Sequence, residues 1–241
     1  MLRNRVILVT NGASGIGLGI AQGLASHGAE LIVTGATQAQ IDDAVAKLGF
    51  YATGVLADLS KVADAERLVA RIQATHGRLD VLILTTATVA DLPIGKITER
   101  AFDQMFDANI KGVAFTIQAA RSIMGDGGSV VIIGDRVPST YEQGMGLTHA
   151  AKSALRSLVE GWTTDLGEIG VRVNLLSGCS ATSPVASIST ASNKELLFSS
   201  RKNRFSFEPN SSQREIIEVA TFLASDTSHY LNGVELLAGK R

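Results

Sequence analysis

Short, uninterrupted apolar runs alternate along the chain with longer segments in which apolar residues recur at helical spacing. Continuous apolar runs are typical of strands that a parallel sheet buries on both faces. Four uninterrupted runs are Val6–Val9, Leu31–Val33, Val81–Leu84 and Val130–Ile133. Val171–Leu176 and Val234–Leu237 are weaker versions that include polar residues, and Tyr51–Leu56 is a less regular seventh candidate. The segments between them follow the 3.6-residue period of helices, as in the stripe from Leu155 to Ile169. This alternation predicts an α/β fold of right-handed βαβ units, with about seven mainly parallel strands flanked by helices.

The overall composition limits the classes of protein that fit. The chain has 241 residues, 45% of them hydrophobic and 19% charged, and its formal net charge is −1. A charge so close to zero lacks the basic surface that nucleic-acid binding requires, and the first apolar run is too short to span a membrane. The single cysteine, Cys179, offers neither an internal disulfide nor a metal cluster. We therefore expect a cytoplasmic protein with no nucleic-acid partner, no membrane partner and no metal.

The regular pattern holds for the whole chain except one stretch. No repeat or change of composition divides the chain, so a single domain over residues 1–241 is expected. Residues 177–212 are rich in Ser, Thr and Asn. A segment of this length in a compact domain is usually a lid or a binding loop, or it contains a short helix. We expect residues 177–212 to form the substrate or lid loop, with residues 194–202 as the place for a short helix.

The first predicted strand runs into a glycine-rich turn, Thr10-Asn11-Gly12-Ala13-Ser14-Gly15-Ile16-Gly17, which opens a predicted helix. Glycines in such a turn let the chain bend sharply, let a phosphate approach the backbone and let the helix pack closely on the strand. The N–H groups at the start of the helix then face the negative charge of a pyrophosphate. The turn predicts a dinucleotide site, although a purely structural tight turn would also need glycines.

Further segments extend this pattern over nearly the whole chain. They are Ala57-Asp58-Leu59-Ser60, residues 77–82, Asn109-Ile110-Lys111-Gly112, Arg172-Val173-Asn174 and residues 222–226. Together with the glycine turn they resemble, in the same order, the motifs of the short-chain dehydrogenase/reductase (SDR) family. The resemblance implies a single-domain Rossmann-type doubly wound sheet and an NAD(P)-dependent oxidoreductase that acts on an alcohol or carbonyl substrate.

The resemblance also implies which residues contact the cofactor. They are Thr10, Asn11, Ser14, Gly15, Ile16, Gly17, Gly35, Asp58, Leu59, Thr85, Ala87 and Lys152. Gly35 stands where NAD-binding members carry an acidic residue, so nothing there repels a 2′-phosphate; the sequence leans slightly towards NADP and leaves NAD open. Two positions where the family has glycine hold Asn11 and Thr88, and the β-branched Thr88 would crowd the ribose side of the site.

The family's catalytic set is Ser, Tyr and Lys, supported by Asn, and the resemblance places it at Asp135, Thr148, Lys152 and Asn109. Lys152 follows Thr148 by four residues, which is one helical turn, and Asp135 precedes Thr148 by 13 residues. Asp135 therefore replaces the Ser and Thr148 replaces the Tyr, while Asn109 and Lys152 are retained.

These replacements change the proton chemistry. The alkyl hydroxyl of Thr148 ionises far above a phenol, and a neighbouring ammonium lowers a pKa by only about 1–3 units, so Thr148 is a poor acid or base near neutral pH. Asp135 could transfer a proton, but a carboxylate that simply pairs with Lys152 is the preferred interpretation. Tyr141 is interpreted as a surface residue of the loop that precedes the helix.

Three functions stay open at this point. The first is an SDR-like oxidoreductase with an altered and impaired active site. The second is an inactive SDR pseudoenzyme that serves as a binding or partner subunit, and the third is an isomerase or lyase that uses Asp135 without redox chemistry. The resemblance implies a homodimer or homotetramer through two long helices near residues 99–124 and 146–168, and the small-molecule substrate is not identified.

Overall fold

The computed structural model describes residues 2–86, 92–135, 144–178 and 211–238, and its strands form one seven-stranded sheet. The strands are β1 (Val6–Val9), β2 (Glu30–Gly35), β3 (Ala52–Leu56), β4 (Val81–Thr85), β5 (Ser129–Asp135), β6 (Arg172–Gly178) and β7 (Glu235–Ala238). Their spatial order is β3-β2-β1-β4-β5-β6-β7, and all neighbours are parallel. The predicted Rossmann-type doubly wound α/β fold is confirmed.

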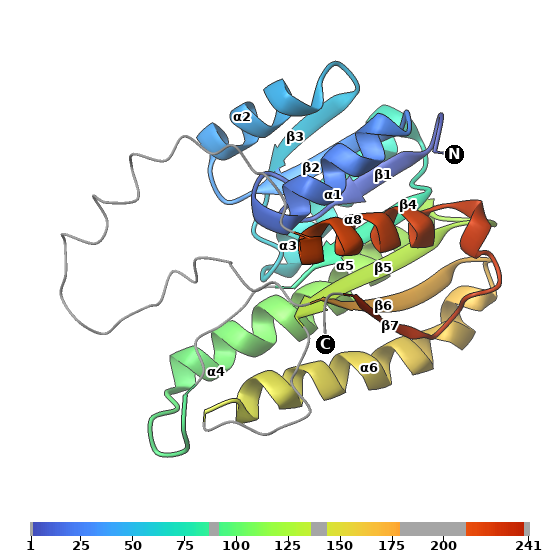
Figure 1. Ribbon diagram of the computed structural model, residues 1–241. Helices are drawn as coiled ribbons and strands as arrows, with labels where there is room; N and C mark the ends of the chain where they lie inside the picture. The colour runs from blue at the N-terminus through green and yellow to red at the C-terminus, as the bar shows by residue number, and fades with distance from the viewer. Residues whose placement is uncertain (1, 87–91, 136–143, 179–210, 239–241) are drawn as a thin grey trace.

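Helices cover both faces of this sheet (Figure 1). One layer contains α1 (Gly15–Ser26), α2 (Gln38–Leu48) and α8 (Ser211–Ala224), and the other contains α3 (Val62–His76), α5 (Gly112–Ala120) and α6 (Gly146–Gly167). Successive β1 side chains enter opposite layers: Ile7 and Val9 pack with α1 and α8, whereas Val6 and Leu8 pack with α3, α5 and α6. Burial on both faces explains why β1, β2 and β4 read as apolar runs, whereas β3, at the edge of the sheet, is only partly buried.

The strand order reverses beside β1, which pairs with β2 on one side and with β4 on the other. The register places Val9, near the end of β1, beside Val33 of β2 and Ile83 of β4. Doubly wound sheets bind ligands at the carboxyl ends of their strands where the order reverses. The residues that follow β1, β2 and β4 therefore meet at the edge of the sheet where a ligand is expected.

The predicted helix over residues 99–124 is interrupted. It consists of α4 (Glu99–Phe106), a π-helical segment η1 (Asp107–Lys111), α5 and a short 3₁₀ turn η2 (Arg121–Ile123). A π-helical segment inside a longer helix is uncommon and is frequent at functional sites. The second predicted long helix, near residues 146–168, is α6.

The bounds predicted for the substrate loop, residues 177–212, overlap a strand at one end and a helix at the other. β6 continues through Gly178 because Ser177 and Gly178 still pair with both β5 and β7, and α8 already begins at Ser211. Residues 179–210, including the helix predicted at residues 194–202, lie outside the described residues.

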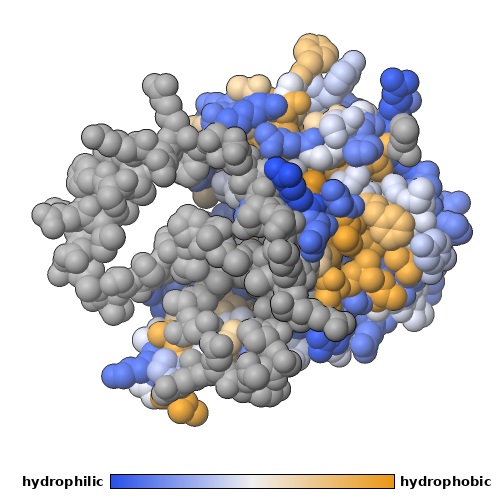
Figure 2. Space-filling view, in the orientation of Figure 1, coloured by the Kyte–Doolittle hydropathy of each residue, from blue (hydrophilic) through white to orange (hydrophobic). Residues whose placement is uncertain are grey.

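The face of the molecule seen in Figure 1 carries apolar side chains over α8 and β7, as Figure 2 shows. Two of the exposed residues at this end of the chain are Tyr230 and Leu237, whose relative exposures are 67% and 63%. Within the described ranges, no helix combines the length and the apolarity needed to cross a membrane.

Candidate functional site

The glycine turn joins the carboxyl ends of β1, β2 and β4. Thr10 is buried; its Oγ1 accepts a hydrogen bond from the backbone N–H of Thr85 at 2.9 Å, and its carbonyl accepts one from the Thr85 hydroxyl at 2.8 Å. The backbone N–H of Asn11 donates to Oγ1 of Thr34 at 2.9 Å. These bonds fix the start of the turn against both neighbouring strands.

Two residues of the turn, Asn11 and Gly15, have a left-handed backbone conformation. Asn is one of the few residues that can replace glycine in this conformation. The φ angles are 50° at Asn11 and 52° at Gly15. Asn adopts this conformation more readily than most non-glycine residues. The side chain of Asn11 also donates to the carbonyl oxygen of Thr85 at 3.4 Å. Asn11 therefore keeps the shape of the turn that a glycine would give.

Gly17 and Gly15 differ in the space around them: packing requires glycine at Gly17, whereas Gly15 borders space that a ligand could fill. A Cβ at Gly17 would lie 2.5 Å from the carbonyl oxygen of Asn11, so only glycine lets α1 approach the turn this closely. A Cβ at Gly15 would meet no protein atom within 4 Å. Ser14, which caps α1, makes no side-chain bond to the helix, and Ile16 packs into the core. The start of α1 thus borders open space, which fits the pyrophosphate of a dinucleotide.

Gly35 is the last residue of β2, and the packing around it leaves no room for a side chain. A Cβ there would lie 2.7 Å from the Cβ of Ala13 and 2.9 Å from Cγ1 of Ile41. Any side chain at this position would push α2 away from the glycine turn. The missing acid therefore has a packing cause, and Gly35 alone does not argue for NADP over NAD.

The opposite wall of the site begins after β3. The Asp58 carboxylate accepts hydrogen bonds from the hydroxyl and the backbone N–H of Ser60, at 2.7 and 3.2 Å, and lies 3.1 Å from Nζ of Lys61. The Ser60 hydroxyl is the main cause of a lowered Asp58 pKa, and the Lys61 charge adds to it against the effect of partial burial. A Cβ at Gly112 would lie 2.6 Å from the carbonyl oxygen of Leu59, so glycine lets α5 close this wall.

These segments surround a cavity of about 660 Å³, a volume in the range of cofactor sites. Six residues of the predicted cofactor set line it: Thr10, Asn11, Gly35, Asp58, Leu59 and Thr85. Ser14, Gly15, Ile16 and Gly17 belong to the adjoining turn. Asp64 and Arg67 of α3, which form an ion pair, also line the cavity. No motif marks these two residues in the sequence, because their position depends on how α3 packs.

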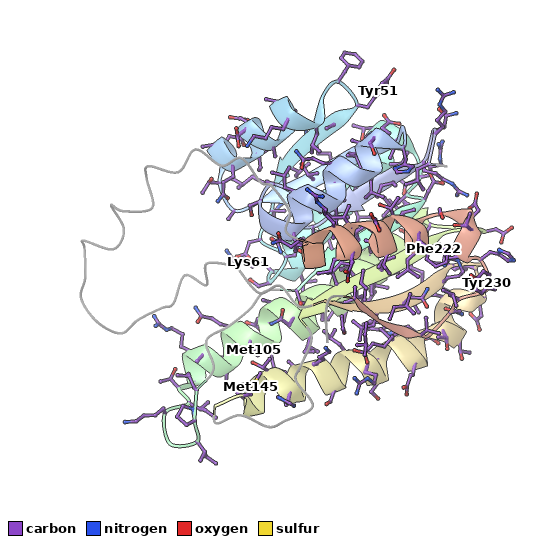
Figure 3. All side chains as sticks on the ribbon, viewed as in Figure 1. Tyr51, Lys61, Met105, Met145, Phe222 and Tyr230 are labelled. Carbon is purple, nitrogen blue, oxygen red and sulfur yellow. The ribbon has the colours of Figure 1, made fainter. Side chains whose placement is uncertain are left out.

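Asn109 lies in the π-helical segment and is buried, with 3% of its surface exposed. Its Nδ2 donates to Sδ of Met105 at 3.2 Å. The segment η1 also packs against α6. Figure 3 labels Met105 and Met145, which lie where α4 approaches the start of α6. The π segment therefore places Asn109 on the helix layer that carries Thr148 and Lys152.

Thr148 and Lys152 lie in the first two turns of α6 and, four residues apart, share one side of the helix. Lys152 is largely buried, with 11% of its side chain exposed, and its Nζ lies 3.6 Å from Oε1 of Glu235 on β7. Asp135, expected to pair with Lys152, is the last residue of β5, where its backbone pairs with Gly178. Its side chain lies outside the described part of the chain, so that pairing stays a prediction.

Glu235 is the functional candidate that the sequence did not single out. The Ser177 hydroxyl donates to its Oε1 at 2.5 Å, and Nε and Nη2 of Arg156 donate to its Oε2 at 2.8 and 2.5 Å. Partial burial alone would raise the pKa of the Glu235 carboxyl, but these hydrogen bonds and the charges of Lys152 and Arg156 together lower it. Glu235 is therefore a carboxylate at neutral pH.

Three residues of the sequence predictions lie outside the described residues, namely Ala87, Thr88 and Tyr141. Among the residues that are described, no group of three or more His, Cys, Asp or Glu could hold a metal ion. The described site thus has two parts: the cavity with the glycine turn, and the pair of helices that carry Asn109, Thr148 and Lys152.

Matches to known proteins agree with this geometry. A family model described as Enoyl-(Acyl carrier protein) reductase matches residues 12–239. The oxidoreductase asL5 of Sarocladium schorii is 32% identical over 242 residues, which cover 98% of this chain and 94% of that protein. Dehydrogenase/reductase SDR family member 4 of Homo sapiens is 31% identical over 245 residues, or 99% and 87% of the two chains. The chain belongs to the short-chain dehydrogenase/reductase family.

A solved SDR structure supports the same assignment. A short chain dehydrogenase from Burkholderia cenocepacia J2315, in complex with NADP, matches with a TM-score of 0.82 and 26% identity, covering 98% of this chain and 96% of that one. This SDR chain is accordingly an oxidoreductase of the NAD(P)-using kind. The glycine turn, with its open space at Gly15, and the cavity beside it are the parts that fit the cofactor.

Proposed function

We propose that this SDR protein transfers hydride between NADP(H) and an alcohol or carbonyl group of a small molecule, with slow turnover because its proton chemistry is altered. One observation carries the proposal. The cavity and glycine turn that fit the cofactor share the carboxyl edge of the sheet with the beginning of α6, which bears Lys152 (Figure 1). When bound, the nicotinamide supplies or accepts the hydride.

The chain's own residues would handle the charge and the proton. Lys152 is a cation placed to stabilise an oxygen that gains negative charge during carbonyl reduction. Thr148 would donate a hydrogen bond to that oxygen without giving up its proton. Asp135, or a water molecule held by Lys152, would supply the proton. A well-placed general acid contributes about 10²–10⁴-fold to a rate, so the loss of the Tyr predicts slow turnover.

Three observations support a preference for NADP. Neither Gly35 nor the two residues after it, Ala36 and Thr37, is acidic, so no carboxylate at the end of β2 repels a 2′-phosphate. Arg67 lines the cavity, although Asp64 neutralises much of its charge. The related Burkholderia protein is described in complex with NADP.

Titration with NADPH and with NADH by calorimetry tests the proposal first. We expect NADPH to bind in the micromolar range and NADH more weakly. A panel of alcohols and carbonyls, followed through the absorbance of the reduced cofactor, then identifies a substrate, and Lys152→Ala should lower kcat at least tenfold. Absence of binding by both cofactors at millimolar concentration would overturn the proposal. Unchanged turnover in Lys152→Ala would remove Lys152 from the mechanism.

A second candidate function is a cofactor-binding partner subunit without turnover, and the presence of Thr148 in the position of the Tyr favours it. Calorimetry would then show cofactor binding while no substrate of the panel is converted. Co-purification with a second SDR chain that has an intact Tyr would support this alternative. Turnover by the chain purified alone would exclude it.

We also propose that the protein is cytoplasmic and forms a homodimer or homotetramer through the helices near residues 99–124 and 146–168. On α4, Phe102 stacks on Phe106 with ring centroids 4.5 Å apart and leaves 44% of its surface exposed, and Phe115 on α5 leaves 37% exposed. Exposed aromatic side chains that join in one apolar patch are typical of association surfaces. Light scattering should give a mass of two or four chains, and Phe102→Asp with Phe115→Asp should lower it to one.

A further inference from the structure

Four polar side chains from three elements converge beneath α6. Glu235 lies on β7, Ser177 on the neighbouring β6, and Lys152 and Arg156 lie one turn apart on α6. The carboxylate is mostly enclosed, with 17% of the Glu235 side chain exposed, and Lys152 is enclosed further at 11%. A carboxylate in this position costs desolvation free energy that an apolar residue of the same size would not. The cluster therefore calls for an explanation beyond packing.

The two oxygens of Glu235 have different partners. Oε2 receives both hydrogen bonds from Arg156, at 2.8 and 2.5 Å. Oε1 receives the Ser177 hydroxyl at 2.5 Å and faces the Lys152 ammonium at 3.6 Å. Arg156 and Ser177 thus orient the carboxylate without any hydrogen bond from Lys152. The result is a fixed negative charge that is directed at Lys152 from β7.

We propose that Glu235 is a positioning residue, which holds the Lys152 ammonium in place for its role in the active site. The attraction acts between two largely enclosed groups, where it is screened less than at the surface. In the function proposed above, Thr148 is a poor acid. Stabilisation of the negative charge on the substrate oxygen therefore depends mainly on Lys152. The expected effect of Glu235 on turnover rests on that proposed function, whereas the contact between Glu235 and Lys152 is independent of the proposed function.

The test compares Glu235→Gln with Glu168→Gln. Glu168 is a matched control, because it also pairs with an arginine, Arg121 at 3.7 Å, but lies at the far end of α6. In the cofactor-free protein, the ¹H–¹⁵N signal of the Lys152 ammonium, assigned with Lys152→Ala, should move or disappear in Glu235→Gln. It should stay in place in Glu168→Gln. An unchanged Lys152 signal in Glu235→Gln would overturn the proposal.

Kinetics supply the functional half of the test. Glu235→Gln should lower kcat about tenfold and change the KM for NADPH less, because no described residue of β7 lines the cavity. Equal kcat in Glu235→Gln and in a wild type that shows measurable turnover would overturn the positioning role but not the proposed function. If the wild type shows no turnover, the proposed function fails, and the ammonium signal still decides whether Glu235 holds Lys152.

A second variant guards against misfolding. Arg156 is half exposed, with 51% of its side chain accessible, so Arg156→Gln should leave the fold intact. It releases Oε2 and lets the carboxylate rotate, so the Lys152 signal should shift in the same direction as in Glu235→Gln but by less. A Lys152 signal unaffected by Arg156→Gln in a folded protein would contradict the argument that Arg156 orients the carboxylate.

Discussion

The two halves of the sheet's carboxyl edge differ in what determines their residues. In the cofactor half, at the ends of β1 to β4, backbone contacts dictate the key positions: a Cβ at Gly17 or Gly112 would lie 2.5 or 2.6 Å from a carbonyl oxygen. In the proposed catalytic half, at α6 and β5 to β7, side chains would carry the chemistry, and the resemblance to the family places Thr148 at the position of the Tyr. A fold preserves what its packing requires, whereas catalytic side chains can change without loss of the fold.

Replacement of Gly17 by alanine should have the largest effect, because it attacks the packed half. The new Cβ would meet the carbonyl oxygen of Asn11, so either α1 or the turn must move. Overpacking of this kind costs about 1–3 kcal/mol of unfolding free energy, and the displaced turn should weaken NADPH binding at least 100-fold. Denaturant unfolding and calorimetry measure the two effects.

Gly161→Ala is the matched control for this substitution. Gly161 lies inside α6, and a Cβ there would meet no atom within 4 Å. Alanine is a better helix former than glycine, so this variant should gain up to about 1 kcal/mol and bind NADPH normally. Normal NADPH affinity in Gly17→Ala would show that the glycine turn is not set by packing, and the contrast between the two halves would fail.

Thr148→Tyr tests the catalytic half, where this substitution should raise kcat. A phenol one helical turn before Lys152 restores a group that can exchange a proton near neutral pH. We expect kcat to rise about 10- to 100-fold with the affinity for NADPH unchanged. Thr148→Phe, which has the same bulk without the hydroxyl, should show no gain. A gain in both variants would mean that bulk, and not proton transfer, limits the rate.

The sequence predicts the fold well because the central strands are buried on both faces and therefore read as apolar runs. All seven candidate runs became strands, and the glycine turn became the bend between β1 and α1. The interruption at η1 left no such pattern, since the apolar residues of the predicted helix continue across it. A π turn is decided by local hydrogen bonding and tertiary contacts, such as the one between Asn109 and Met105.

The candidate site was predictable only where a local motif exists. The cavity residues Thr10, Asn11, Asp58 and Thr85 lie at or just after strand ends, and the resemblance to the family's motifs implied them. Glu235 stands in the apolar run Val234–Leu237, where a single charge usually faces solvent, and its partners come from α6 and β6. Contacts between residues so far apart in sequence appear only when the layers are assembled.

Ala36→Asp tests whether the end of β2 sets the cofactor preference, with a smaller expected effect. Ala36 is exposed and lines the cavity, so an acid fits there without the crowding found at Gly35. Its charge should weaken NADPH binding about tenfold through repulsion of the 2′-phosphate and leave NADH binding unchanged. Ala36→Asn is the uncharged control. Equal losses for NADPH and NADH would indicate a steric effect instead.

The pH dependence of the free energy of unfolding compares the two halves directly, and its expected effect is the smallest. Asp58 in the cofactor half and Glu235 in the catalytic half both have a lowered pKa, but 53% of the Asp58 side chain is exposed and only 17% of the Glu235 side chain. A carboxyl whose pKa is lower in the folded state stabilises the fold above its unfolded pKa, ordinarily 4.5 for Glu, and loses this contribution as pH falls through the folded value.

Glu235→Gln should therefore lower the unfolding free energy by about 1 kcal/mol at pH 7, where the hydrogen bonds from Ser177 and Arg156 act on a charged group. The difference from the wild type should shrink as the pH falls below about 4.5, because the wild-type carboxyl is then neutralised as well. Asp58→Asn should show a smaller difference at every pH, since water screens its partners. Denaturant unfolding at pH 7 and pH 3.5 measures both. A larger effect at Asp58 than at Glu235 would mean that enclosure beneath α6 does not strengthen the Glu235 cluster, and the fixed charge assigned to Glu235 would lose its physical basis.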